Sequence, residues 1–185
     1  QSAQVIVGKF KNKQIAKFKF PGLTAIDGPQ FAPSGKQVIF TGQQTGINDL
    51  YLYDFSAGKL TKLTNDFNDD SNPVFSPDGR EIVFASELNQ QYDLNILELT
   101  TGKIRPLTNL PGNEFAPVYA PDGNKIYFIS DADGISDIYA TGTSTTVISR
   151  LTHTSGGNFS PRVSPDGKTI LFCSFYRGEK QLYLL

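Results

Sequence analysis

The 185-residue sequence has very few of the residue types on which several kinds of chemistry depend. A single cysteine, Cys173, excludes an internal disulfide and any zinc-ribbon pattern. A single histidine, His153, excludes any mechanism that needs two histidines. No apolar run approaches the roughly 20 residues that cross a bilayer as a helix, so we expect no membrane span in this segment.

The chain also lacks an excess of charge of either sign. Lys and Arg number 17 and Asp and Glu number 18, which gives a net charge of −1 at pH 7. A protein that works mainly on phosphate backbones carries a clear basic excess, so we expect no nucleic-acid partner. Because 38% of the residues are hydrophobic and only 19% are charged, the chain is expected to fold around a core.

The amino terminus has no signal-peptide pattern, since residues 1–20 contain no charged segment followed by an apolar one. The chain begins at Gln1. A secreted or periplasmic protein whose signal has been removed would begin in this way, and so would a piece excised from a longer chain. We favour the first reading.

A repeat of 44 residues is the strongest pattern in the sequence. Tetrapeptides that end in Pro-Asp-Gly, and in one copy Pro-Ser-Gly, place their prolines at this spacing: Pro33, Pro77, Pro121 and Pro165. A second series at the same spacing is aromatic: Phe40, Phe84, Phe128 and Phe172. A third series is aliphatic: Leu50, Leu94, Ile138 and Leu182. Independent series with one period indicate tandem copies of a single structural unit.

Each unit has the pattern of four short strands. In the second unit we predict strands over residues 73–76, 81–85, 93–99 and 104–108, with a tight Pro-Asp-Gly turn after the first strand. No stretch keeps a helical period over 12 residues. The second strand is apolar on both faces, which is expected of a sheet packed between two others. A unit of this size with four antiparallel strands is typical of a propeller blade.

The order of motifs in one unit carries a family resemblance. The segment Pro-x-Phe-Ser-Pro-Asp-Gly is followed by an Ile-x-Phe strand and then by Thr-Gly-Lys and Leu-Thr. This order resembles the TolB-like β-propeller repeat, a WD40-like family of Pro-Asp-Gly repeats, in four copies over residues 21–185. The resemblance implies an all-β propeller of four-stranded antiparallel blades. Its members include periplasmic envelope proteins, secreted proteins and the gating propellers of some serine peptidases, so it constrains function much less than fold.

We predict one propeller domain over residues 1–185. Its repeats are expected at residues 21–64, 65–108, 109–152 and 153–185. The last repeat reaches only its third strand, and residues 15–20 align one period before the fourth strand of the first repeat. We therefore predict that residues 1–20 complete the last blade and close a ring of four blades. The alternatives are an open fragment of a larger propeller and two copies that associate into an eight-bladed ring.

Blade topology predicts two unlike faces. The connections between blades and those between second and third strands share one face, which we call the loop face: residues 21–28, 41–49, 65–72, 86–93, 109–116, 130–137, 153–160 and 174–181. These segments hold 12 of the 18 acidic residues and only two basic ones, Arg177 and Lys180. We predict an acidic surface for a basic partner or a cation. Asp49, Asp93 and Asp137 recur at the repeat spacing, so we expect them to bond backbone at the start of the third strand.

Seven residues of these loops are the candidate binding residues: Phe67, Asp69, Asp70, Glu114, Asn158, Tyr176 and Arg177. Phe67 and Tyr176 are predicted to be exposed, and aromatic side chains beside Asn and Asp are typical of recognition surfaces.

Candidate metal ligands are weak. Asp70, Glu114 and Asn158 share one position of the repeat and are predicted to form a ring of oxygens at the channel mouth. Asp131 and Asp133 have the spacing of a calcium loop but lack its distal glutamate, so we interpret them as a turn. We expect no cofactor, with Ca²⁺ at these oxygens as the alternative.

No serine lies in a Gly-x-Ser-x-Gly segment, and we interpret His153 as a loop residue and Cys173 as a buried, inert one. The sequence thus predicts a non-catalytic, secreted or periplasmic scaffold that binds a protein or an envelope polymer. The alternatives are a propeller hydrolase or lyase with a metal at the channel, and the propeller part of a longer peptidase or envelope protein.

Overall fold

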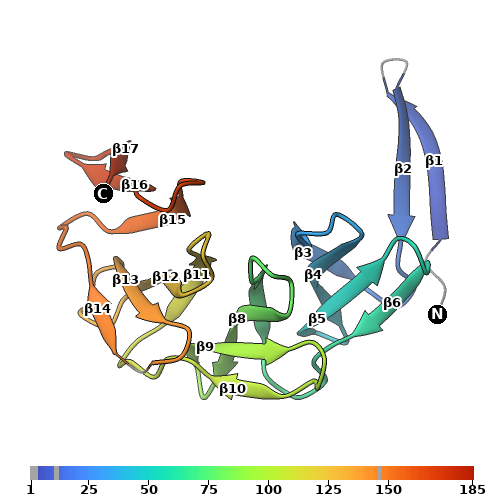
Figure 1. Ribbon diagram of the computed structural model, residues 1–185, viewed down its shortest axis with the longest axis horizontal. Coiled ribbons are helices and arrows are strands. Elements are labelled where there is room, and N and C mark those ends of the chain that lie inside the picture. Colours follow the sequence, from blue (N-terminus) through green and yellow to red (C-terminus); the bar gives the residue numbers. More distant parts are fainter. Residues whose placement is uncertain (1–3, 11–12, 146) are drawn as a thin grey trace.

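The computed structural model describes residues 4–10, 13–145 and 147–185, and these residues form strands joined by turns. Four antiparallel sheets follow one another along an arc, and Figure 1 shows β3, β11 and β15 on its inner side and β6, β10 and β14 on its outer side. None of the described residues belongs to a helix long and apolar enough to span a membrane.

Each sheet is one blade and lies within one predicted repeat. Blade 1 consists of β3 (Ala25–Phe31), β4 (Gln37–Gln44), β5 (Ile47–Asp54) and β6 (Lys59–Lys62). Blade 2 consists of β7 (Asp70–Phe75), β8 (Glu81–Leu88), β9 (Gln91–Glu98) and β10 (Ile104–Pro106). Blade 3 consists of β11 (Glu114–Tyr119), β12 (Lys125–Ser130), β13 (Asp137–Gly142) and β14 (Ile148–Arg150). Blade 4 consists of β15 (Asn158–Val163), β16 (Ile170–Tyr176) and β17 (Glu179–Leu184).

The repeated tetrapeptide forms the turn between the first and second strands of each blade. In blade 2, Asp78 Oδ1 accepts hydrogen bonds from Ser76 Oγ (2.6 Å) and from the Arg80 N–H (3.1 Å). Gly79 has a φ of 72°, in the left-handed region that glycine adopts without strain. The Pro-Asp-Gly pattern therefore closes the hairpin through its own side chain and backbone.

The core lies between successive blades. Phe40, Phe84 and Phe128 are almost completely buried, as their shared position in the repeat predicts. Between blades 2 and 3, for example, Leu94 packs in one cluster with Phe128. Blades 2 and 3 pack against a neighbour on each face, whereas Leu171, Leu182 and Leu184 of blade 4 are exposed. The stability of a blade therefore depends on the blades beside it.

A β-bulge interrupts the innermost strand of every blade. The register of β3, β7, β11 and β15 shifts at equivalent points, where one residue has a positive φ: Gly28 (58°), Asn72 (52°), Ala116 (50°) and Ser160 (53°). A bulge re-aims the side chains that follow it, so simple alternation along the strand does not say which of them face the axis of the arc.

The predicted closure of the ring by residues 1–20 is not present. β1 (Gln4–Phe10) pairs with β2 (Lys13–Lys19) in a sheet of its own, and no described strand pairs with the outer edge of β17. Phe18 and Phe20 instead pack on Tyr53 of blade 1, with ring centroids 5.3 and 5.2 Å apart. Since β2 already has an edge partner and buries its aromatic residues on blade 1, the hairpin lies at the opposite end of the arc from blade 4 (Figure 1).

Candidate functional site

Polar side chains are buried where each blade meets the next. We call the contact between blades 1 and 2 the first junction, that between blades 2 and 3 the second junction, and that between blades 3 and 4 the third junction. In each junction a threonine hydroxyl accepts the N–H at the start of the third strand of the preceding blade. Thr64 bonds the Leu50 N–H (2.9 Å), Thr108 that of Leu94 (2.8 Å) and Thr152 that of Ile138 (2.9 Å). The repeated Leu-Thr pair therefore joins the end of one blade to its third strand.

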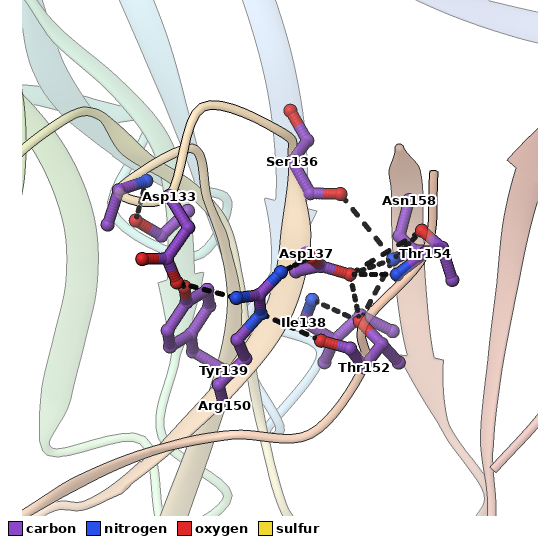
Figure 2. Close-up of polar contacts among 11 residues, drawn as sticks. Asp133, Ser136, Asp137, Ile138, Tyr139, Arg150, Thr152, Thr154 and Asn158 are labelled. Atoms are coloured by element: carbon purple, nitrogen blue, oxygen red, sulfur yellow. Dashed lines mark hydrogen bonds and ion pairs between the residues drawn. The ribbon is translucent and has the colours of Figure 1, made fainter. Parts of the chain in front are cut away.

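The third junction is centred on Asp137, which is fully buried (Figure 2). Its Oδ1 accepts hydrogen bonds from Thr152 Oγ1 (2.6 Å) and from Asn158 Nδ2 (2.7 Å). Its Oδ2 pairs with the Arg150 guanidinium at 2.6 Å, and Arg150 also reaches Asp133 at 2.7 Å. One buried negative charge is thus matched by one guanidinium and several donors, which is the condition for burying a carboxylate.

The second junction holds two carboxyl groups. Glu114 is fully buried beside Asp93, and Ser130 Oγ donates to its Oε1 at 3.5 Å. Within the described part of the chain, Oε2 has no hydrogen-bond partner. Burial raises the pKa of Glu114 to about 8, and the neighbouring Asp93 adds to this shift. Glu114 therefore holds its proton at neutral pH.

The first junction has a similar pair, but one member is neutralised. Asp49 Oδ2 pairs with Lys62 Nζ at 2.7 Å. Asp70 is buried, and neither of its oxygens has a hydrogen-bond partner among the described residues. Burial raises the pKa of Asp70 to about 6. Asp49 and Asp137 thus serve the junctions mainly through side-chain partners. The prediction that this series bonds backbone at the start of the third strand is wrong, because the threonine hydroxyls accept those N–H groups.

The predicted ring of Asp70, Glu114 and Asn158 at a channel mouth is not formed. All three side chains are buried, and each belongs to a different junction, where it contacts residues of neighbouring strands rather than an open channel. The side chains described by the structure include no group of three His, Cys, Asp or Glu residues placed to hold a metal ion.

Asp131 and Asp133 form part of a turn, as we interpreted them. Asp131 Oδ1 accepts the Asn113 N–H at 2.6 Å. Asp133 Oδ2 accepts the Tyr139 hydroxyl at 2.8 Å, in addition to its pair with Arg150. Each carboxylate is used to fix a loop.

The loop face is less acidic than the composition of its segments suggested. Of its 12 acidic side chains, four are buried in the junctions and four more are half-buried. The exposed ones are Asp27, Asp66, Asp133 and Glu179. The sequence correctly places the acids in these loops, but it does not say that most of them turn inward to bond backbone and neighbouring side chains.

An apolar anchor is the most prominent feature of the loop face. Phe67 is 95% exposed, in the loop that joins blades 1 and 2. Asp69 fixes this loop from both sides: its Oδ1 accepts the Asn48 N–H (2.8 Å), and its carbonyl accepts the Glu87 N–H (2.9 Å). The second bond places the loop next to Leu88, which is 58% exposed.

A second exposed group lies at the turn between β16 and β17. Tyr176 is 51% exposed, and the Arg177 guanidinium lies over its ring at 5.2 Å. Beside it, Phe175 makes an edge contact with Phe159 at 5.7 Å. Two of the predicted binding residues, Tyr176 and Arg177, thus lie together on the surface.

Sequence reasoning missed Leu88. Leu88 and Tyr176 end the second strands of their blades and are two repeat periods apart, so an alignment of the four copies would have shown that both present a large apolar side chain at one position. His153 is exposed in its loop as interpreted, whereas Cys173 is only half-buried.

Comparisons with known proteins agree with the repeat. The family model PD40, described as the TolB beta propeller domain, matches residues 1–93 and 88–185. TolB from Acinetobacter baumannii is 24% identical with a TM-score of 0.79, over 94% of this chain and 43% of that one. A putative TolB from Agrobacterium tumefaciens is 22% identical with a TM-score of 0.81, over 92% and 65%. The curated proteins include no match.

An oligogalacturonate lyase solved in complex with manganese is 19% identical, with a TM-score of 0.68, over 94% of this chain and 50% of that one. The chain therefore spans less than two thirds of each of these three proteins. At these identities the structural likeness shows the fold. The predicted TolB-like repeat and antiparallel propeller blades are confirmed, with four strands in blades 1 to 3 and three described strands in blade 4.

Proposed function

On the premise that the chain belongs to the PD40 family of TolB beta propeller domains, we propose that it is a non-catalytic scaffold that binds a protein partner through its loop face. The observation that carries this proposal is the nearly complete exposure of Phe67 on a loop whose backbone is fixed by Asp69. An apolar ring held in water by an ordered loop has no role in the core of the blade.

The surroundings of Phe67 suit a protein interface. Interface hot spots are enriched in aromatic residues, surrounded by contacts that exclude water and edged by polar groups. Leu88, next to the Glu87 N–H that bonds this loop, is a second exposed apolar side chain, and the exposed Asp66 and half-buried Glu87 supply polar atoms. Tyr176 and Arg177 offer a second anchor on the same face.

The compartment forms part of the proposal, as secreted or periplasmic. TolB-like propellers that resemble this chain at low identity are periplasmic proteins. Such a compartment would bring the loop face into contact with envelope proteins, which we take as the class of partner. An envelope polymer is the alternative ligand, and turnover of a polymer by the purified protein would favour the lyase or hydrolase alternative instead.

Site-specific photo-cross-linking tests the proposal. A photoreactive phenylalanine at position 67 is exposed to an envelope extract, and Lys168, an exposed residue of a Pro-Asp-Gly turn on the other face, serves as the control position. We expect a discrete product from position 67 that Leu88→Ser removes, and none from position 168. The same products at both positions, or products unaffected by Leu88→Ser, would contradict the proposal.

The captured protein is then purified and titrated against the wild type and Phe67→Ser. Loss of a hot-spot aromatic residue is expected to weaken binding by about 30-fold. An affinity unchanged by Phe67→Ser would show that the partner binds elsewhere.

A further inference from the structure

A cavity of about 290 Å³ lies where the innermost strands of all four blades converge. Its wall combines residues of β3, β7, β11 and β15: Gly28, Gln30, Asn72, Pro73, Val74, Ala116, Pro117, Val118 and Arg162. Neither Phe67 nor Tyr176 belongs to this wall, so the cavity is separate from the proposed protein-binding face.

Arg162 is the one charged residue in the wall of this cavity. It also lines the adjoining cavity of about 310 Å³, which likewise has no carboxylate in its wall. Within the described residues, the Arg162 guanidinium makes one hydrogen bond, from NH1 to the Pro161 carbonyl at 2.8 Å, and no ion pair. Arg162 is exposed, and a guanidinium carries five N–H donors, so most of its donors face solvent and can bind a ligand.

The position of Arg162 in the repeat makes this charge distinctive. Gln30, Val74 and Val118 occupy the same place in the other three blades, directly after the bulge. Three neutral side chains and one guanidinium therefore face the same axis. A structural requirement of the repeat does not explain a charge that three of the four copies lack.

Two amide side chains add polar groups to the cavity. Asn72 Oδ1 accepts the Ala116 N–H at 3.3 Å, which leaves the Asn72 NH₂ group as a donor. Gln30 contributes a second amide to the wall. The apolar side chains of the wall are the prolines and valines of β7 and β11 and Ala116.

We propose that this central cavity binds a small monocarboxylate with a branched apolar body, and that Arg162 holds its carboxylate. The planar guanidinium fork matches a carboxylate in a two-point contact. One guanidinium with neutral amide donors balances one negative charge, whereas a phosphate dianion would keep an unmatched charge. The valines and prolines contact the hydrocarbon part, and the volume suits a ligand at the small end of the usual range.

The test compares an acid with its uncharged analogue on the wild-type protein. N-acetyl-L-valine and N-acetyl-L-valinamide have the same shape and differ in charge, and each is titrated by NMR. We expect saturable shifts of the Arg162 side-chain and Ala116 backbone signals with the acid, and affinity weaker by about tenfold or more with the amide. No saturable binding, or equal binding of acid and amide, would overturn the proposal.

Variants locate the site. Arg162→Gln is expected to weaken binding of N-acetyl-L-valine by about tenfold. Arg80→Gln, which removes an exposed guanidinium from a turn, should leave it unchanged. Equal losses in both variants, or none in Arg162→Gln, would contradict the assignment.

Inorganic phosphate that binds the cavity as tightly as N-acetyl-L-valine would also contradict the proposal of a monocarboxylate ligand. These outcomes are independent of cross-linking at Phe67, so either proposal can fail alone.

Discussion

Glu114 in the second junction and Asn158 in the third occupy the same position of the repeat. The different contacts of these two side chains show what that position does. At the second junction Glu114 lies beside Asp93, and the described residues supply no ion pair to either carboxyl group. At the third junction Asn158 donates to Asp137, which is also paired with Arg150. Both junctions are buried, and only the second must keep a carboxyl group protonated.

The comparison separates structural polar residues from candidates for function. A buried polar side chain occupies this position in three of the four copies, whereas the exposed Ile26 occupies it in blade 1. The polar side chain sets how the stability of its junction depends on pH. Residues of this kind hold blades together. Phe67, which is exposed and has no counterpart at the repeat spacing, is the residue that the fold itself does not require.

Asp137→Ala is expected to give the largest effect. It leaves the half-buried Arg150 guanidinium and the buried Asn158 and Thr152 donors without their common acceptor, which costs about 4 kcal/mol. Thermal unfolding should move down by about 10 °C. The control is Asp133→Ala, which removes the more exposed partner of the same guanidinium and should cost under about 1 kcal/mol. Equal losses would show that burial of Asp137 does not decide the stability of the junction.

Asn158→Asp makes the third junction resemble the second. It replaces a donor to Asp137 by a second buried carboxyl group, so we expect a loss of about 3 kcal/mol at pH 7. The loss should shrink at pH 5, where the new group can hold a proton. Urea unfolding at the two pH values measures it, and a loss that does not depend on pH would contradict a charge-based explanation.

Glu114→Gln removes the ionisable group from the second junction. Because the folded-state pKa of Glu114 is raised to about 8 from its usual 4.5, its protonated form stabilises the fold fully below pH 4.5. That contribution is lost as pH rises through 8. The free energy of unfolding of the variant should therefore exceed that of the wild type by on the order of 2 kcal/mol at pH 9, and the two should be equal at pH 5.

Asp70 is present in both proteins, so its own titration near pH 6 cancels in this difference. Parallel urea-unfolding curves at pH 5, 7 and 9 give the result. A constant difference across that range would mean that Glu114 does not change its charge there.

Phe67→Ser should have the smallest effect on stability, within about 0.5 kcal/mol, because the ring is exposed and contributes little to the core. Thermal unfolding of the variant beside Phe84→Ser, a core position of the repeat, provides the contrast. A large loss in Phe67→Ser would assign the ring to the fold rather than to a partner.

The repeat made most of the fold predictable. Apolar residues at a period of 44 specify where each blade begins and which phenylalanines are buried, because every copy packs in the same way. Closure was not predictable in this manner, since residues 15–20 align with a fourth strand whether they pair with blade 4 or pack on blade 1. The aromatic contacts of Phe18 and Phe20 decide that question, and they involve residues far apart in the sequence.

The site was predictable only where a residue departs from the repeat. Phe67 and Tyr176 stood out in this way, and both are exposed. Asp70 and Glu114 share one position of the repeat, and the sequence does not show that this position is buried between blades. Arg162 was overlooked because the candidate residues all came from the loop segments, whereas Arg162 lies within β15.

The central claim is that the loop face binds a partner while the junction carboxyl groups maintain the fold. Calorimetric titration of the cross-linked partner, once purified, against Phe67→Ser/Leu88→Ser and against Glu114→Gln tests it most directly. We predict that the first variant loses at least about 30-fold in affinity and that the second binds as the wild type does. Wild-type affinity in the first variant, or an equal loss in Glu114→Gln, would contradict the claim.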